Sequence, residues 1–156
     1  MTESHDHAVT VHVSQSEAET VSLGRALGRE LHAGDVVLLE GTLGAGKTAF
    51  TRGLAEGLGC DPDEVSSPTF AIVQAYRGRV PLQHVDLYRL APAEVNDLDL
   101  DELGEGCAMA IEWPERWANA PANAWRVALE PLDGDTRRIT IVPPAPIPRG
   151  SSALPS

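Results

Sequence analysis

A glycine-rich segment with a single lysine constrains this chain more than any other feature. Residues 41–48 read Gly-Thr-Leu-Gly-Ala-Gly-Lys-Thr and fit the pattern G-x-x-x-x-G-K-[ST]. Residues 36–40, Val-Val-Leu-Leu-Glu, form a short apolar run typical of a strand that is covered on both faces. A helical pattern follows from about Lys47 to Leu58 and ends at Gly59. Strand, loop and helix in this order predict a phosphate-binding loop, or P-loop, in an α/β domain.

The chemistry of such a loop is directed at the phosphates of a nucleotide. Its glycines allow backbone N–H groups to curl around phosphate oxygens, and the N-terminus of the next helix adds partial positive charge. Lys47 would reach the β- and γ-phosphates as a compact charge, and Thr48 would give its hydroxyl to Mg²⁺. Lys47 is also the only lysine in a chain whose Lys and Arg residues number 12.

The remaining pattern predicts one domain around this loop. We expect a P-loop NTPase fold of class α/β, with a central mixed, mostly parallel sheet flanked by helices and carrying β-hairpins. The domain would span residues 9–142, between a flexible N-terminal tail (1–8) and a disordered proline-rich C-terminal tail (143–156). Further elements are expected at 10–13 (strand), 16–32 (helix), 70–76 with 80–85 (hairpin), 108–111 (strand) and 127–129 with 138–142 (hairpin). Ser14 and Glu17 match a capping box for the first helix.

Composition excludes several classes of protein. The formal net charge of −11 argues against a protein that grips DNA or an anionic membrane through bulk electrostatics. No apolar run approaches the roughly 20 residues that a membrane-spanning helix needs, and the N-terminus is too polar for a signal peptide. Cys60 and Cys107 lie in no Cys-x-x-Cys or Cys/His spacing, so we expect plain thiols in a reducing, cytoplasmic compartment.

A P-loop needs a second acidic group to help place Mg²⁺ or the attacking water. Two residues are candidates. Glu112 ends the apolar run 108–111, and Asp86 ends the second strand of the first predicted hairpin. His84, two residues before Asp86, is interpreted as a packed or surface histidine rather than a proton shuttle.

A P-loop of this kind also occurs in GTPases and in small-molecule kinases. Residues 101–104 match the D-x-x-G pattern of GTPases, but no Asn-Lys-x-Asp guanine-reading motif can exist in a chain whose only lysine lies in the P-loop. A small-molecule kinase remains the alternative, since Arg77, Arg79 and Arg89 could form part of a clamp on a transferring phosphate.

Four motifs together resemble the bacterial TsaE family. They are Gly-Ala-Gly-Lys-Thr at 44–48, Ser-Pro-Thr-Phe at 67–70, His-Val-Asp-Leu-Tyr-Arg-Leu at 84–90 and Ile-Glu-Trp-Pro-Glu at 111–115, and the match covers about 16–142. The resemblance implies an ATP hydrolase, weak alone, that serves formation of threonylcarbamoyladenosine beside the anticodon of tRNA. It implies ATP and Mg²⁺ as ligands and the proteins TsaD and TsaB as partners, with ATP hydrolysis resetting their complex between turnovers and tRNA involved only indirectly.

The resemblance also implies roles for individual residues. Thr48 and Glu112 match the Mg²⁺ ligands, and Asp86 matches an essential acid near the γ-phosphate. Thr69 lies in a segment similar to a switch loop, and Trp113 matches a tryptophan beside the metal ligand. The phosphate-binding stretch matches Gly44, Ala45, Gly46, Lys47, Thr48 and Ala49, and the adenine side would involve Ser16 and Arg137. The proline-rich tail after Val142, and Ala49 where a hydroxyl residue is common, depart from the family pattern.

Overall fold

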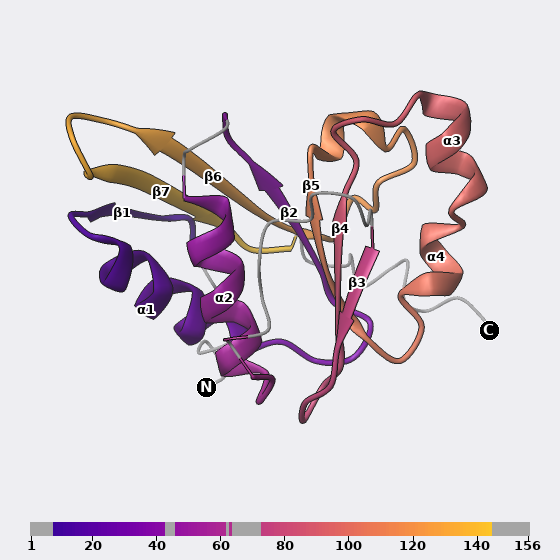
Figure 1. The fold of residues 1–156 in the computed structure, drawn as a ribbon, viewed down its shortest axis with the longest axis horizontal. Helices are drawn as coiled ribbons and strands as arrows, with labels where there is room; N and C mark the ends of the chain where they lie inside the picture. The colour runs from indigo at the N-terminus through magenta and orange to yellow at the C-terminus, as the bar shows by residue number, and fades with distance from the viewer. Residues whose placement is uncertain (1–7, 43–45, 62, 64–72, 145–156) are drawn as a thin grey trace.

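A mixed β-sheet runs through the molecule (Figure 1). The computed structural model describes residues 8–42, 46–61, 63 and 73–144, and within them the sheet has seven strands. They are β1 (Thr10–Ser14), β2 (Val36–Glu40), β3 (Val73–Tyr76), β4 (Leu82–Asp86), β5 (Ala108–Glu112), β6 (Trp125–Pro131) and β7 (Arg137–Val142). Their order across the sheet is β1-β7-β6-β2-β5-β4-β3.

The centre of the sheet is parallel and its margins are antiparallel. β6, β2, β5 and β4 pair in parallel, whereas β3 pairs antiparallel with β4, and β7 pairs antiparallel with both β6 and β1. The prediction of a mixed, mostly parallel sheet with two hairpins is therefore confirmed. The buried run of β2 lies at the middle of the sheet, as expected of a strand that is covered on both faces.

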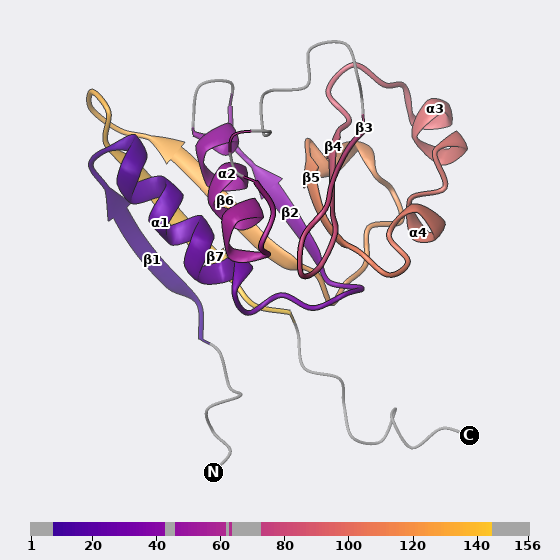
Figure 2. The same cartoon turned by 60° about the horizontal axis from the view of Figure 1, so that its bottom comes forward.

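Helices cover both faces of the sheet (Figure 2). α1 (Glu17–Gly28) and α2 (Lys47–Gly57) pack against each other and, through buried side chains such as Leu27 and Phe50, against one face. On the other face, α3 (Pro92–Asp97) and α4 (Leu100–Leu103) bury Val95 and Leu100 against β4 and β5. Together with the short 3-10 helix η3 (Pro114–Arg116), these elements give the α/β class that the sequence predicted.

The first helix differs from its prediction at both ends. Its capping box is Ser16 with Glu19, not Ser14 with Glu17: the Glu19 N–H donates to Ser16 Oγ (3.1 Å), and Glu19 Oε1 accepts from the Gln15 N–H (2.7 Å). The Ser14 hydroxyl is instead shared with Thr20, at 2.8 Å. At its other end the helix stops at Gly28 rather than near residue 32, because the following N–H groups turn to nearer carbonyls.

Other differences lie at element ends and between elements. The sequence pattern at 90–105 predicts no helix, yet α3 and α4 form there. α3 starts at Pro92, and the Ala91 N–H donates to the Glu94 side chain. β6 is longer than the predicted 127–129. Residues 70–72 of the predicted hairpin, and most of the two predicted tails, lie outside the described residues. In the part of the chain that the structure describes, no helix is long and apolar enough to cross a membrane.

Candidate functional site

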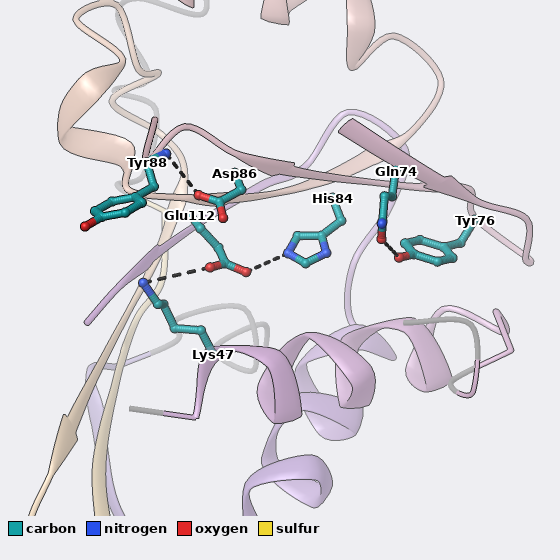
Figure 3. A network of polar contacts seen from close by, with 7 residues as sticks. All are labelled: Lys47, Gln74, Tyr76, His84, Asp86, Tyr88 and Glu112. Atoms are coloured by element: carbon teal, nitrogen blue, oxygen red, sulfur yellow. Dashed lines mark hydrogen bonds and ion pairs between the residues drawn. The ribbon is translucent and has the colours of Figure 1, made fainter. Parts of the chain in front are cut away.

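Strand alternation brings the two predicted acids together. Asp86 and Glu112 end the neighbouring parallel strands β4 and β5 and are register partners, so both lie at the carboxyl edge of the sheet. Side chains two apart in a strand share a face, which places His84 on the same side as Asp86. That side is the one covered by α2, whose first residue is Lys47. Figure 3 shows these four side chains converging.

Gly46 connects the glycine-rich loop to α2. Its φ of 101° lies in the left-handed region, which glycine adopts without steric cost, and the Phe50 N–H donates to its carbonyl at 3.0 Å. The helix therefore begins at Lys47 and directs its N-terminal partial positive charge toward the loop. Gly44 and Ala45 lie outside the described residues, so the predicted phosphate cradle remains a prediction at those positions.

Lys47 is a buried cation without a hydrogen-bond partner among the described residues. Its side chain is 5% exposed, and its Nζ lies 3.8 Å from Glu112 Oε1, which is an ion-pair distance but too long for a hydrogen bond. Nζ also lies 4.6 Å from the centroid of the Trp113 ring, within reach of a cation–π contact. Buried ammonium groups are costly unless their hydrogens are satisfied, so this lysine is suited to an anionic ligand with several oxygens.

Glu112 joins the lysine to a histidine that sequence reasoning left aside. Glu112 Oε2 accepts from His84 Nε2 at 2.7 Å, and the His84 side chain is fully buried. The interpretation of His84 as a packed residue is thus confirmed, and its bond to Glu112 adds a polar partner that the interpretation missed. The spacing of two between His84 and Asp86 on one strand predicts that both side chains lie on the same face, but it does not identify Glu112 as the partner of His84.

Asp86 occupies the less buried part of this cluster. Its Oδ1 accepts from the Tyr88 N–H at 3.0 Å. Burial raises the pKa of its carboxyl above the ordinary value, and the nearby negative charge of Glu112 adds to the rise, while the Tyr88 hydrogen bond and the charge of Lys47 act in the opposite direction. A carboxylate of raised basicity, close to Lys47, is suited to hold a water molecule or a proton.

An aromatic pair lies beside the cluster. The ring of Trp113 packs against that of Tyr88, with centroids 4.7 Å apart and planes 38° apart. Trp113 has a φ of 61°, a left-handed conformation that is rare for a large side chain. This turn directly follows Glu112, so it aims the indole at Lys47 rather than along the strand.

The remaining predicted site residues lie in different parts of the chain. Thr48 and Ala49 are in the first turn of α2, half-buried and buried respectively, while Thr69 lies outside the described residues. Arg137 is near the loop, since its Nε is 3.9 Å from the point where a Cβ on Gly46 would stand. Ser16 caps α1 through its hydroxyl, so that oxygen already serves the helix.

Two of the three arginines that supported the kinase alternative lie away from the cluster. Arg77 and Arg79 lie in the turn between β3 and β4, at the end of β4 opposite to Asp86. Arg79 donates to the carbonyls of Gly28 (3.3 Å) and Gly57 (3.2 Å), at the C-terminal ends of α1 and α2. In the described part of the chain, those two arginines therefore cannot clamp a phosphate held at Lys47.

Comparison with known proteins agrees with the architecture. Residues 14–139 match the model of the family described as threonylcarbamoyl adenosine biosynthesis protein TsaE. The TsaE protein of Nostoc sp. is 42% identical over 144 residues, 88% of each chain, and that of Treponema pallidum is 42% identical over 132 residues, 83% of this chain and 97% of its own.

Among solved structures, the crystal structure of Bacillus subtilis YdiB superposes with a TM-score of 0.71 at 29% identity, covering 90% of this chain and 89% of that one. The likeness covers most of both chains and confirms a P-loop type of fold. On the family match and these identities, the resemblance seen in the sequence is confirmed, and the chain belongs to the TsaE family of threonylcarbamoyl adenosine biosynthesis proteins.

Proposed function

We propose that this chain is the ATP-hydrolysing subunit of the machinery that forms threonylcarbamoyladenosine in tRNA. Family membership places the chain in that biosynthesis; ATP hydrolysis, and the resetting of a TsaB–TsaD complex between turnovers, are the proposed parts. The observation that carries the proposal is the buried Lys47 ammonium at the start of α2, which faces Glu112 and has no hydrogen-bond partner among the described residues.

Each residue then has a defined task on ATP. Lys47 binds β- and γ-phosphate oxygens, which supply the hydrogen-bond acceptors that its Nζ lacks. Asp86, whose carboxyl pKa is raised mainly by burial, orients the attacking water by accepting a hydrogen bond from it. The water oxygen bonds to the γ-phosphorus as one water proton passes to Asp86, and the bond from that phosphorus to the bridging oxygen breaks. ADP and inorganic phosphate then leave, and the proton is released to solvent.

The residues present fit a magnesium ion bound with the nucleotide. Glu112 Oε1 accepts no hydrogen bond from the described residues, and a carboxylate oxygen is a ligand that Mg²⁺ prefers. Thr48 and Glu112 would hold the ion, which supplies positive charge that offsets the phosphates when bound. Among the described residues no group of three or more His, Cys, Asp or Glu side chains could hold a metal by itself. Such a ligand set suits Mg²⁺, which keeps waters and phosphate oxygens in its coordination shell.

The same geometry supports a weak enzyme when alone. Phosphoryl transfer gains greatly from a second cation on the transferring group, and two of the candidate cations, Arg77 and Arg79, lie at the far end of β4. We propose that TsaB and TsaD complete or order the site when they bind, so that hydrolysis is coupled to their cycle. tRNA would be served indirectly, in accord with the net charge of −11.

The test is a phosphate-release assay on the full chain with Mg²⁺ and ATP, alone and with increasing TsaB and TsaD. We expect a low rate alone, a saturable rise with the two partners, and loss of both in Lys47→Ala. A rate that stays unchanged at saturating partners would reject the partner-activated ATPase. Transfer of phosphate to a small-molecule acceptor, without the partners, would favour the kinase alternative instead.

A further inference from the structure

His84 is a buried polar side chain to which the proposed reaction gives no task. It is fully buried on β4, and its Nε2 lies 2.7 Å from Glu112 Oε2 (Figure 3). Its other ring nitrogen, Nδ1, has no hydrogen-bond partner among the described residues. Gln74, its register partner on β3, has its side-chain oxygen bonded to the Tyr76 hydroxyl. One ring nitrogen is therefore used and the other is left unsatisfied.

Packing alone does not account for a histidine at this position. Leu82, two residues earlier on the same face of β4, belongs to the apolar core, and so does Ala110, the register partner of His84. An aliphatic side chain at position 84 would fill the same space and leave no buried nitrogen without a partner. The histidine is accounted for if its bond to Glu112 serves the site.

That bond fixes the orientation of the Glu112 carboxylate. A carboxylate oxygen can only accept, so the Nε2 of His84 carries the hydrogen and donates it. Among the described residues, His84 is the one hydrogen-bond donor to this side chain, since Lys47 lies 3.8 Å from Oε1. With Oε2 held by the ring, Oε1 is turned toward Lys47 and the start of α2.

We infer that His84 is a positioning residue, which holds Glu112 through its Nε2–H so that Oε1 is presented to the metal ion bound with the nucleotide. This rests on the proposed function, in which Glu112 ligates Mg²⁺. Ligands of metal ions are commonly oriented by such outer partners, and losing one costs about 10–100-fold in metal affinity. This role requires hydrogen on Nε2, because the carboxylate oxygen that it contacts can only accept.

Substitutions at position 84 can distinguish the need for a hydrogen-bond donor at the place of Nε2 from the need for any polar side chain. In His84→Gln the amide nitrogen falls near the place of Nε2 and can still donate to Glu112. In His84→Asn it falls near the place of Nδ1 and does not reach. His84→Leu fills the space without a donor. Gln83→Met is the matched control, because Gln83 is the next residue on β4, faces the other side and also carries a buried atom without a partner.

The measurement is the affinity for ATP with excess Mg²⁺, divided by the affinity with excess EDTA, for each full-length variant. We expect the ratio to fall by about tenfold or more in His84→Leu and His84→Asn, and to stay within about threefold of wild type in His84→Gln and Gln83→Met. The affinity in EDTA should be unchanged, because the proposed role of His84 is to hold Glu112 and not to contact the nucleotide. A wild-type ratio in His84→Leu would overturn the inference and make His84 a core residue only.

A second measurement needs neither ATP nor a folded variant. Ring ¹⁵N shifts of the wild-type protein without nucleotide should show His84 with hydrogen on Nε2. The opposite tautomer would overturn the inference even if every substitution unfolded the chain. A failure of the proposed function would give a different result. The wild-type protein would then show no Mg²⁺-dependent gain in ATP affinity, whatever the His84 tautomer, and His84 could have no role in presenting Glu112 to a metal ion.

Discussion

At the scale of single residues, the site is an unbalanced group of charges that a nucleotide would complete. Lys47 is almost fully buried between Glu112 and the Trp113 ring, and its Nζ lacks a hydrogen-bond acceptor among the described residues. The gap between Nζ and Oε1 is 3.8 Å, so the pair keeps its Coulomb attraction without the hydrogen bond that would lock it. A phosphate can therefore bind the Lys47 ammonium without breaking a hydrogen bond.

The identity of the cation should matter as much as its charge. Lys47→Arg keeps the charge but brings a planar fork into a space that holds one ammonium, against the Trp113 ring. We expect it to lose ATP hydrolysis by at least about 100-fold, close to Lys47→Ala, a barrier rise of roughly 2.7 kcal/mol. Circular dichroism and urea unfolding should show both variants folded. Hydrolysis near the wild-type rate in Lys47→Arg would contradict this account.

We expect the ionised Asp86 carboxylate to lower the free energy of unfolding. Its pKa is raised mainly by burial, so its ionised form is less favourable in the folded chain than in the unfolded one. The penalty develops as pH rises from about 4, the ordinary value for Asp, and is complete above the raised pKa. Asp86→Asn keeps the acceptor for the Tyr88 N–H and removes the charge.

We therefore expect Asp86→Asn to be at least as stable as wild type near pH 7, and to lose this advantage as pH falls toward 4. Urea unfolding of both proteins across that range measures the difference. ATP hydrolysis by the variant should be lost while ATP binding is kept. An advantage that grows on acidification would mean that the pKa is lowered, not raised.

At the scale of elements, the sequence predicts which segments form helices and strands better than it predicts where these elements begin and end. The P-loop, the acids Asp86 and Glu112 and the hairpins follow from local patterns: a glycine-rich motif, apolar runs and turn residues. The capping box of α1 was misplaced because Ser14 and Ser16 both have an acid three residues on, and only the tertiary bond of Ser14 to Thr20 decides between them. The His84–Glu112 bond could not be read from the sequence, because it depends on which strands become neighbours.

The contact between α1 and α2 depends on four glycines that lie outside the motifs described above. They are Gly24 and Gly28 in α1 and Gly53 and Gly57 in α2, each pair spaced by four, so each pair lies on one face of its helix. A Cβ on Gly53 would stand 2.1 Å from the carbonyl oxygen of Val21, and one on Gly24 would stand 2.2 Å from that of Phe50. Backbone atoms meet backbone atoms here, so no side chain can move aside.

This close approach decides the sign of a Gly53→Ala substitution. Alanine favours a helix over glycine by roughly 0.5–1 kcal/mol, whereas overpacking a tight contact costs typically about 1–3 kcal/mol and more where the backbone must shift. The clash should prevail, with a net loss of about 1–2 kcal/mol in urea unfolding. Gly134→Asn is the control, since its φ of 62° suits asparagine and nothing lies within 4 Å. A more stable Gly53→Ala would refute this packing.

At the scale of the whole molecule, charge is unevenly placed. Six acids and no base occupy residues 94–105. Four of them lie in α3 and α4, on the side of the molecule away from the β6–β7 turn (Figure 1). Val95 and Leu100 anchor these short helices to the core, while Asp97, Asp101 and Glu102 are exposed. Such a surface is either a solvated face or a contact for a basic partner.

The proposed partners supply the test that separates these two roles. If the acidic helices meet basic residues of TsaB or TsaD, the variant Asp97→Asn/Asp101→Asn/Glu102→Gln should bind the pair several-fold more weakly than wild type. Its affinity should also depend less on salt, because exposed charges are screened over about 8–10 Å near physiological ionic strength.

The control Asp61→Asn/Asp133→Asn/Asp135→Asn makes the same change in net charge, −11 to −8, on exposed residues outside α3 and α4. Titrations at 50 and 300 mM salt, read by binding and by the rise in ATP hydrolysis, compare the three proteins. Equal weakening in both variants would show that net charge alone acts, and no weakening in either would leave the acidic helices as a solvated face and place the contact elsewhere.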